Sequence, residues 1–193
     1  VRSNNWTAYT SADGLPSDRT FAVWGKGSRT VWVGTDQGAA LYDDDEWQAY
    51  GVADGLVGRE VRAIWGDGQK TFWFGTDAGL SRYDGEGWTS WTAADGLPSN
   101  SIRALWGTED GMLWIGTDEG LSRFDGEVGW ETWTVQDELP SNAITFVGGD
   151  GAGEIWVGTD AGVSFYTGAE WKSYDASSGL SDPSVQTVVQ DAS

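Results

Sequence analysis

VGTD at Val33–Asp36 recurs as FGTD at Phe74–Asp77, IGTD at Ile115–Asp118 and VGTD at Val157–Asp160. The glycines of the four copies stand at positions 34, 75, 116 and 158, so each copy follows the last after 41, 41 and 42 residues. Strand-like segments fill each interval, and a period of about 40 residues built from short strands is typical of a β-propeller with four-stranded antiparallel blades. The repeat therefore predicts an all-β propeller. It says less about function, because a propeller acts through loops and side chains on one face.

The repeat divides the chain, taken as one domain over residues 1–193, into four full blades. The predicted blades cover about residues 20–51, 61–92, 102–134 and 144–175. Further copies of single strands stand at both ends, as an orphan outer strand at 6–10 and an orphan inner strand at 185–190. The middle strands of that terminal blade are missing. We therefore expect these residues to be a segment of a larger propeller, or a ring that closes through assembly.

Two turn motifs connect the predicted strands. Gly-Thr-Asp-x-Gly joins the second strand to the third, and its second glycine is expected to take a positive φ while its aspartate accepts backbone N–H groups two residues on. Ala-Asp-Gly-Leu-Pro-Ser, at Ala12–Ser17 and Ala94–Ser99, joins one blade to the next. Its leucine is expected to plug the space between blades. Fourteen Trp residues in register indicate an aromatic core that lies between stacked blades.

Composition excludes several classes of function. A net charge of −19 makes nucleic acid and direct membrane insertion poor expectations, and no apolar stretch approaches the ~18 residues of a membrane span. The chain has no Cys and no His, so it lacks thiolate ligands, the commonest general base and the commonest metal ligand. We predict no cofactor, no metal site, no catalytic residue and no enzymatic activity.

The third repeat carries a family resemblance. Ile102–Trp106 followed by Gly111–Asp125, which reads GMLWIGTDEGLSRFD, resembles the repeat of the two-component-regulator propeller family, and the resemblance recurs in register in all four copies. Members of that family are extracytoplasmic propellers of bacterial sensor kinases and related receptors, and they often sense carbohydrate fragments. The resemblance implies a ligand-binding sensor module, extracellular or periplasmic, with a small-molecule or glycan ligand.

Six residues are candidates for ligand binding, each with a structural alternative. Arg62 and Arg103 occupy a strand-one position that differs between blades, and they could attract an anionic ligand such as an acidic sugar or form ion pairs with the turns. Trp65 and Trp106 close strand one, and they could stack on sugars or fill the core between blades. Asp77 and Asp118 belong to a ring of aspartates that could bind a polyol or cap turns. Gly148 interrupts the tryptophan series, which could open a gap beside the fourth blade.

Two other functions remain open from the sequence. The chain could be a structural protein whose open blade is completed by another copy or by a segment of another propeller, since unpaired strand edges associate readily. It could also be a glycan-active hydrolase or lyase that uses paired carboxylates.

Overall fold

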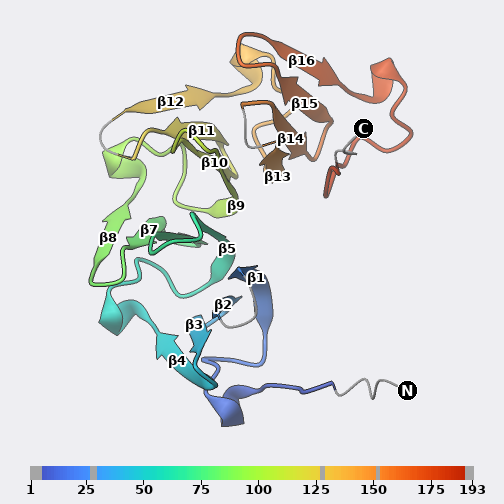
Figure 1. Ribbon diagram of the computed structural model, residues 1–193. Helices are drawn as coiled ribbons and strands as arrows, with labels where there is room; N and C mark the ends of the chain where they lie inside the picture. The colour runs from blue at the N-terminus through green and yellow to red at the C-terminus, as the bar shows by residue number, and fades with distance from the viewer. Residues whose placement is uncertain (1–5, 27–29, 127–128, 151–152, 190–193) are drawn as a thin grey trace.

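The computed structural model describes residues 6–26, 30–126, 129–150 and 153–189. These residues form four separate antiparallel sheets of four strands each, and consecutive strands pair as neighbours in every sheet. Figure 1 shows the sheets as successive blades of an open arc, with β1, β5, β9 and β13 on its concave side and β4, β8, β12 and β16 on its outer side. The predicted all-β propeller of four blades is confirmed.

The sixteen strands follow the sequence repeat. Blade 1 contains β1 (Thr20–Lys26), β2 (Thr30–Thr35), β3 (Gly38–Asp43) and β4 (Glu46–Tyr50). Blade 2 contains β5 (Val61–Gly66), β6 (Phe72–Thr76), β7 (Leu80–Tyr83) and β8 (Trp88–Trp91). Blade 3 contains β9 (Ile102–Gly107), β10 (Leu113–Thr117), β11 (Gly120–Phe124) and β12 (Trp130–Trp133). Blade 4 contains β13 (Ile144–Gly149), β14 (Ile155–Thr159), β15 (Val163–Tyr166) and β16 (Trp171–Tyr174).

The Gly-Thr-Asp-x-Gly turn depends on its threonine more than the sequence suggested. In blade 2 the buried Thr76 hydroxyl donates to the Gly79 carbonyl at 2.8 Å and accepts the Ala78 N–H at 3.1 Å. This is the role expected of Asp77, which instead bonds the residues that precede β5. Gly79 has a φ of 140°, as expected, and a side chain there would collide with the Trp91 carbonyl. The other three blades repeat the threonine bond.

The Asp-Gly-Leu link forms a single 3₁₀ turn. Before blade 3, Asp95 accepts the Thr92 N–H at 2.8 Å, and Gly96 ends the turn with a φ of 116°. Leu97 then points into the space between blades and is 4 % exposed. Equivalent turns occur at Ser11–Asp13, Val52–Asp54, Val135–Asp137 and Ala176–Ser178. Every link therefore supplies a cap and a left-handed turn end, and those before blades 2, 3 and 4 also supply a buried plug.

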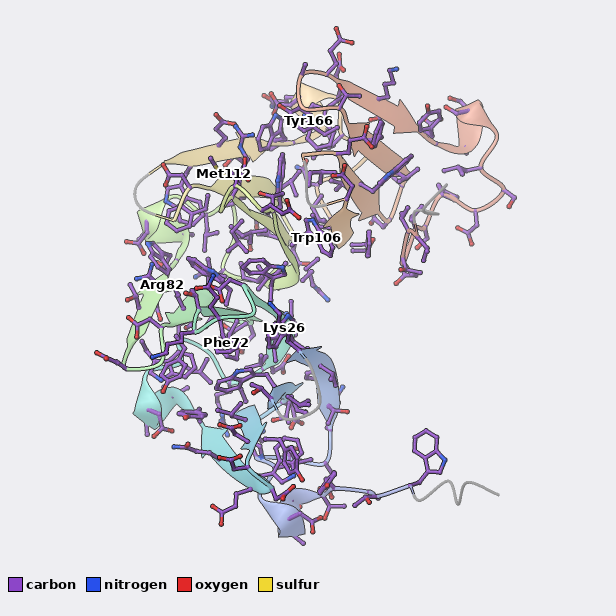
Figure 2. All side chains as sticks on the ribbon, in the orientation of Figure 1. Lys26, Phe72, Arg82, Trp106, Met112 and Tyr166 are labelled. Carbon is purple, nitrogen blue, oxygen red and sulfur yellow. The ribbon has the colours of Figure 1, made fainter. Side chains whose placement is uncertain are left out.

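The core contains three aromatic layers, one in each space between neighbouring blades, and a smaller cluster of Leu15, Val33 and Ala40 on the outer face of blade 1. Leu56, Leu97 and Leu139 each belong to a different layer. In the first layer Phe72 of blade 2 packs on Trp24 and Trp32 of blade 1, at ring-centroid distances of 5.2 and 5.4 Å, and Figure 2 shows Phe72 between these blades. Burying one such ring contributes about 2–3 kcal/mol, so the blades are held together mainly by these layers.

The two terminal segments lie where the repeat predicts, but neither forms a regular strand over its described residues; residue 190 lies outside them. Tyr9 packs on Tyr42 and Trp47 of blade 1. Val185 donates its N–H to the Thr159 carbonyl at 2.9 Å. It lies against blade 4 as Ile102 lies against blade 2 and Ile144 against blade 3. Each segment lacks the neighbouring strand of its own blade, which explains the missing ladder. No helix among the described residues has the length and apolar character needed to cross a bilayer.

Candidate functional site

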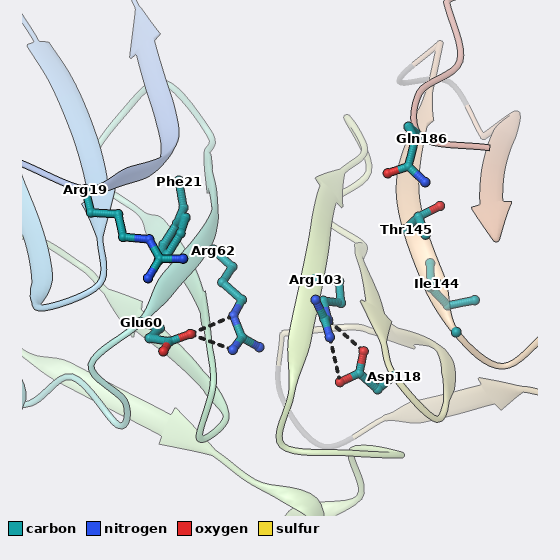
Figure 3. Close-up of a pocket in the computed structure, with 10 residues that line it drawn as sticks. Arg19, Phe21, Glu60, Arg62, Arg103, Asp118, Ile144, Thr145 and Gln186 are labelled. Carbon is teal, nitrogen blue, oxygen red and sulfur yellow. Dashed lines mark hydrogen bonds and ion pairs between the residues drawn. The ribbon is translucent and has the colours of Figure 1, made fainter. Parts of the chain in front are cut away.

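A cavity of about 590 Å³ opens on the concave side of the arc, and all four blades contribute to it (Figure 3). Much of its wall comes from one register position, the second residue of each inner strand. The side chains at that position are Phe21, Arg62, Arg103 and Thr145, with Gln186 at the same position of the C-terminal segment. The backbone is nearly the same in each blade, so the chemistry of the cavity depends on which residue each copy carries at this position.

Arg62 is held toward the cavity by residues on both sides. Its Nη2 and Nε donate to Glu60 Oε2 at 2.6 and 3.2 Å, and its Nη1 donates to the Ser101 hydroxyl of the next blade's link at 2.9 Å. The Arg62 side chain is 25 % exposed and the Glu60 side chain 39 %. The guanidinium is therefore fixed across the boundary between blades 2 and 3.

Arg103 forms a two-bond ion pair with Asp118 of its own blade. Nε and Nη2 of Arg103 donate to the two carboxylate oxygens at 2.6 and 3.1 Å. Burial would raise the pKa of Asp118, but hydrogen bonds from Arg103 and Ser101 outweigh it and lower that pKa below its ordinary value. The same hydrogen bond to Asp118 raises the pKa of Arg103. Both groups are thus charged at neutral pH.

Arg19 completes the row of cations. Its guanidinium carbon lies 5.1 Å from the centre of the Phe21 ring, and no ion pair formed within the described parts of the chain includes it. The lining thus carries three guanidinium groups against the two carboxylates of Glu60 and Asp118. In a chain of net charge −19, this cavity is a local positive site.

The structure brings together three of the six residues singled out from the sequence. Arg62, Arg103 and Asp118 all line the cavity, as Figure 3 shows. Asp77 does not line it, because its Oδ1 accepts the backbone N–H groups of Arg59 and Glu60 at 3.1 Å each. That bonding is structural, because it fixes the link before β5, but it is not the cap of its own turn that the sequence predicted for Asp77.

The two candidate tryptophans lie away from the cavity. Trp65 packs between blades 2 and 3, where its ring covers Gly107. Trp106 belongs to the layer between blades 3 and 4, and Figure 2 places it there. It also lines a second cavity of about 220 Å³ with Phe146 and Gly148. Their positions match the core alternative.

Three residues of the site were not predicted from the sequence, and these are Glu60, Ser101 and Gln186. Glu60 precedes an inner strand by one residue, and its role depends on an arginine two residues later, a spacing that places both side chains on one face of a strand. Gln186 could have been found by extending the repeat register past the degenerate Ser178–Leu180 link. Ser101 offers no signal, because a serine at a strand boundary is commonplace.

Other charged groups serve the scaffold. Arg82 stacks on Trp73 and Trp91, and Arg123 stacks on Trp114 and Trp133 while it pairs with Glu131 at 2.7 Å. Among the described residues, no group of three or more acidic side chains could hold a metal ion. The cavity on the concave side therefore remains the main candidate site.

Comparison with known proteins supports the fold. No family model and no curated protein sequence matches the chain. Among solved structures, it is similar to the extracellular domain of a hybrid two-component system of B. thetaiotaomicron, with a TM-score of 0.75 and 24% identity over 86% of this chain and 24% of that one. It is also similar to the extracellular domain of a one-component system of that organism, with a TM-score of 0.68 and 23% identity over 84% of this chain and 23% of that one.

Enzymes also share the fold. Virginiamycin B lyase from Staphylococcus aureus matches with a TM-score of 0.66 and 13% identity over 86% of this chain and 58% of that one. The chain spans about a quarter of the length of the two extracellular domains. The chain therefore shares its fold with extracellular domains of regulator systems and with enzymes.

Proposed function

We propose that the chain is a non-catalytic ligand-binding module of an extracellular sensor propeller, and that the cavity on its concave side binds an anionic ligand such as an acidic sugar. The observation that carries the proposal is the convergence of Arg19, Arg62 and Arg103 on one cavity in a strongly acidic chain. Arginine is suited to this task because its planar donors match a carboxylate, sulfate or phosphate group.

The ion pairs already present favour binding over catalysis. A glycosidase of the usual kind needs a carboxylic acid whose pKa is raised, so that it can donate a proton. The pKa of Asp118 is instead lowered, and both its oxygens accept bonds from Arg103. Glu60 in turn holds Arg62. The two carboxylates therefore orient arginines toward the cavity, which is the arrangement of a preorganised binding site.

The likeness to the extracellular domains of regulator systems supports a sensor role outside the cytoplasm. In this proposal the chain supplies part of a ligand-recognition surface, and signalling would require domains that these residues do not contain.

The test compares an acidic ligand with a matched neutral one. Isothermal titration calorimetry would measure the binding of an oligogalacturonide and of its fully methyl-esterified form, which removes the charge and keeps the sugar backbone. A glycan array with uronic, sulfated and sialylated members would run in parallel. Binding that requires the free anion supports the proposal. Equal binding of the ester, or no binding of any anionic glycan, contradicts it.

Variants locate the site. The Arg62→Ala, Arg103→Ala double variant should lose about tenfold or more in affinity, since each charge-assisted hydrogen bond contributes about 1.5–3 kcal/mol. The control is Lys70→Ala with Lys172→Ala, which removes the same charge from exposed positions outside the cavity. A third variant, Arg19→Ala, removes a cation from the cavity without breaking an ion pair among the described residues. If the control weakens binding as much as the double variant, long-range charge and not the cavity is responsible.

A further inference from the structure

One kind of aromatic contact recurs at each of the three boundaries between blades. An indole from the second strand and a ring from the end of the fourth strand pack on the next blade. At the first boundary Trp32 and Tyr50 contact Tyr83 at 6.0 and 5.6 Å. At the third, Trp114 and Trp133 contact Trp171 at 6.2 and 5.8 Å. The repeat thus defines a donor face on each blade and an acceptor face on the next.

The acceptor face of blade 1 has no blade in front of it. Val23 is 69 % exposed, whereas Leu105 and Val147, which take its position in blades 3 and 4, are 8 % and 4 % exposed. A cavity of about 380 Å³ lies on this face. Its described lining contains no charged side chain and includes Val31, Val33 and Trp47, with Tyr9 and Leu15 of the N-terminal segment lying against them. An apolar surface of this kind is unusual in a chain of net charge −19.

The acceptor face of blade 1 also has an empty space beside one of its glycines, where blades 2 and 3 receive an indole. A side chain added at Gly66 would meet the Trp24 indole of the preceding blade at 2.8 Å, and one added at Gly107 would collide with the Trp65 indole. The corresponding glycine of blade 1, Gly25, would meet only atoms of its own blade, at 3.6 Å. The face is therefore shaped to receive the donor face of another blade.

The opposite end of the arc carries a donor face that only the C-terminal segment covers among the described residues. Trp156 takes the position of Trp32 and Trp114, which are 0 % and 2 % exposed, yet Trp156 itself is only half-buried. Tyr174 takes the position of Tyr50 and is 43 % exposed. Figure 1 shows that blades 1 and 4 lie at the two ends of the arc, so one copy cannot join its own two faces without a change of curvature.

We propose that the two faces join between two copies of this chain, with Trp156 and Tyr174 of one copy on Tyr42 and Trp47 of the other. The contact is the interface that the chain already forms three times internally, and the occupant with a matching surface is therefore another blade of the same repeat. This interface is heterologous, because it joins different surfaces of the two copies. Two arcs therefore close into a ring if the rotation between the copies allows it, and otherwise successive copies form a filament.

The terminal segments are the internal competitors of this contact. Tyr9 occupies on blade 1 the place that Tyr174 of a second copy would take, and Leu15 occupies the place of Leu180. The N-terminal segment is held through Tyr9 and Leu15, whereas Trp6 is 94 % exposed. Docking exchanges these segments for the equivalent residues of the partner, and Tyr9→Ala should therefore strengthen association.

The test is sedimentation equilibrium of the full chain over a range of protein and salt concentrations. We expect a dimer or a larger assembly that becomes more stable as NaCl rises, because salt screens the repulsion between acidic chains and does not weaken the apolar contact. A monomer at the highest protein concentration in high salt overturns the proposal, and would leave both faces to a different partner or to further blades.

Two variants and a control establish the pairing. Val23→Asp should weaken association by about tenfold or more, because it buries an unpaired charge on the acceptor face. Val52→Asp, at a site that is also exposed (53 %), is the matched control and should change nothing. Tyr174→Asp should weaken association from the donor side. Since these positions are exposed, each variant is expected to fold, and circular dichroism checks this.

A mixture of the two variants tests whether the contact is head-to-tail. Val23→Asp keeps an intact donor face and Tyr174→Asp keeps an intact acceptor face, so an equimolar mixture has one undamaged pairing. A heterodimer that forms only in the mixture confirms the head-to-tail contact. If the mixture stays as monomeric as either variant alone, while the parent chain associates, the contact is a different one and the proposal is wrong.

Discussion

We predict that Phe146 of β13 fills the space that a tryptophan fills in the other inner strands. β5 and β9 carry alanine at their third position and tryptophan at their fifth (Ala104 and Trp106 in β9), whereas β13 carries Phe146 and Gly148. The two positions lie on one face of the strand. A side chain built on Gly148 would meet Cζ of Phe146 at 2.5 Å. The phenyl ring therefore occupies the space that an indole takes in the other blades.

The magnitudes follow from this geometry. Gly148→Trp alone pushes the Phe146 ring toward the adjoining cavity of about 220 Å³, and the packing lost costs about 1 kcal/mol, the low end for overpacking. Phe146→Ala alone removes a half-buried ring and costs about 1–2 kcal/mol, part of the value for full burial. The double variant restores the alanine and tryptophan of blades 2 and 3. It should lie within about 1 kcal/mol of the parent chain, so the two changes couple by about 2 kcal/mol.

The assay is a double-mutant cycle by guanidinium chloride unfolding, followed by far-ultraviolet circular dichroism and compared at a common m-value. Circular dichroism is preferred because one variant adds a tryptophan. Additive effects, with the double variant as unstable as the sum of the single ones, would refute the shared space. A neutral Gly148→Trp variant would refute it as well, because the indole would then have found room beside Phe146.

Three further predictions concern turns and charge. Glu138→Gly should raise the free energy of unfolding by about 1 kcal/mol in urea, because Glu138 has a φ of 74° where the other links have glycine. Asp77→Ala should cost about 1 kcal/mol and Asp77→Asn much less, since an amide oxygen can still accept the two backbone N–H groups. Asp118 has a pKa below its ordinary 3.8 in the folded protein, so the unfolded chain binds more protons and folding gains stability as pH rises. That contribution is complete above 3.8 and is lost as pH falls through the lower value, so urea titrations should show less acid sensitivity for Asp118→Asn.

Much of the scaffold could be predicted from the sequence, because the same strands and turns recur in each blade. The 41-residue period, the strand order and the buried leucine of the link all appear as recurring residues. The acceptor in the Gly-Thr-Asp-x-Gly turn was predicted to be the aspartate, but it is the threonine, and the reason is physical. Thr76 and Asp77 both offer an oxygen acceptor near the same N–H, and only the backbone path shows that Asp77 turns toward Arg59 and Glu60.

The cavity was predicted less well, because its residues come from five successive copies. The variation at the second position of the inner strands pointed to Arg62 and Arg103, and both line the cavity. The ion-pair partners could not be assigned from the sequence. Asp118 pairs with Arg103 whereas Asp77 bonds the backbone before β5, although both occupy the same repeat position. Long side chains choose partners by local geometry, and identical motifs can then differ in role.

The repeat separates the residues that build the propeller from those available for binding. Thr76, Gly79 and Leu97, with their counterparts, bond the turns and fill the layers between blades, and they recur in nearly every copy. The second position of the inner strands faces the cavity and lies outside the layers between blades. It holds phenylalanine, arginine, arginine and threonine in blades 1 to 4. A site assembled from such positions can change its ligand by one substitution per blade, at little cost to folding. This variable position of the repeat is therefore where the specificity of this propeller should be sought.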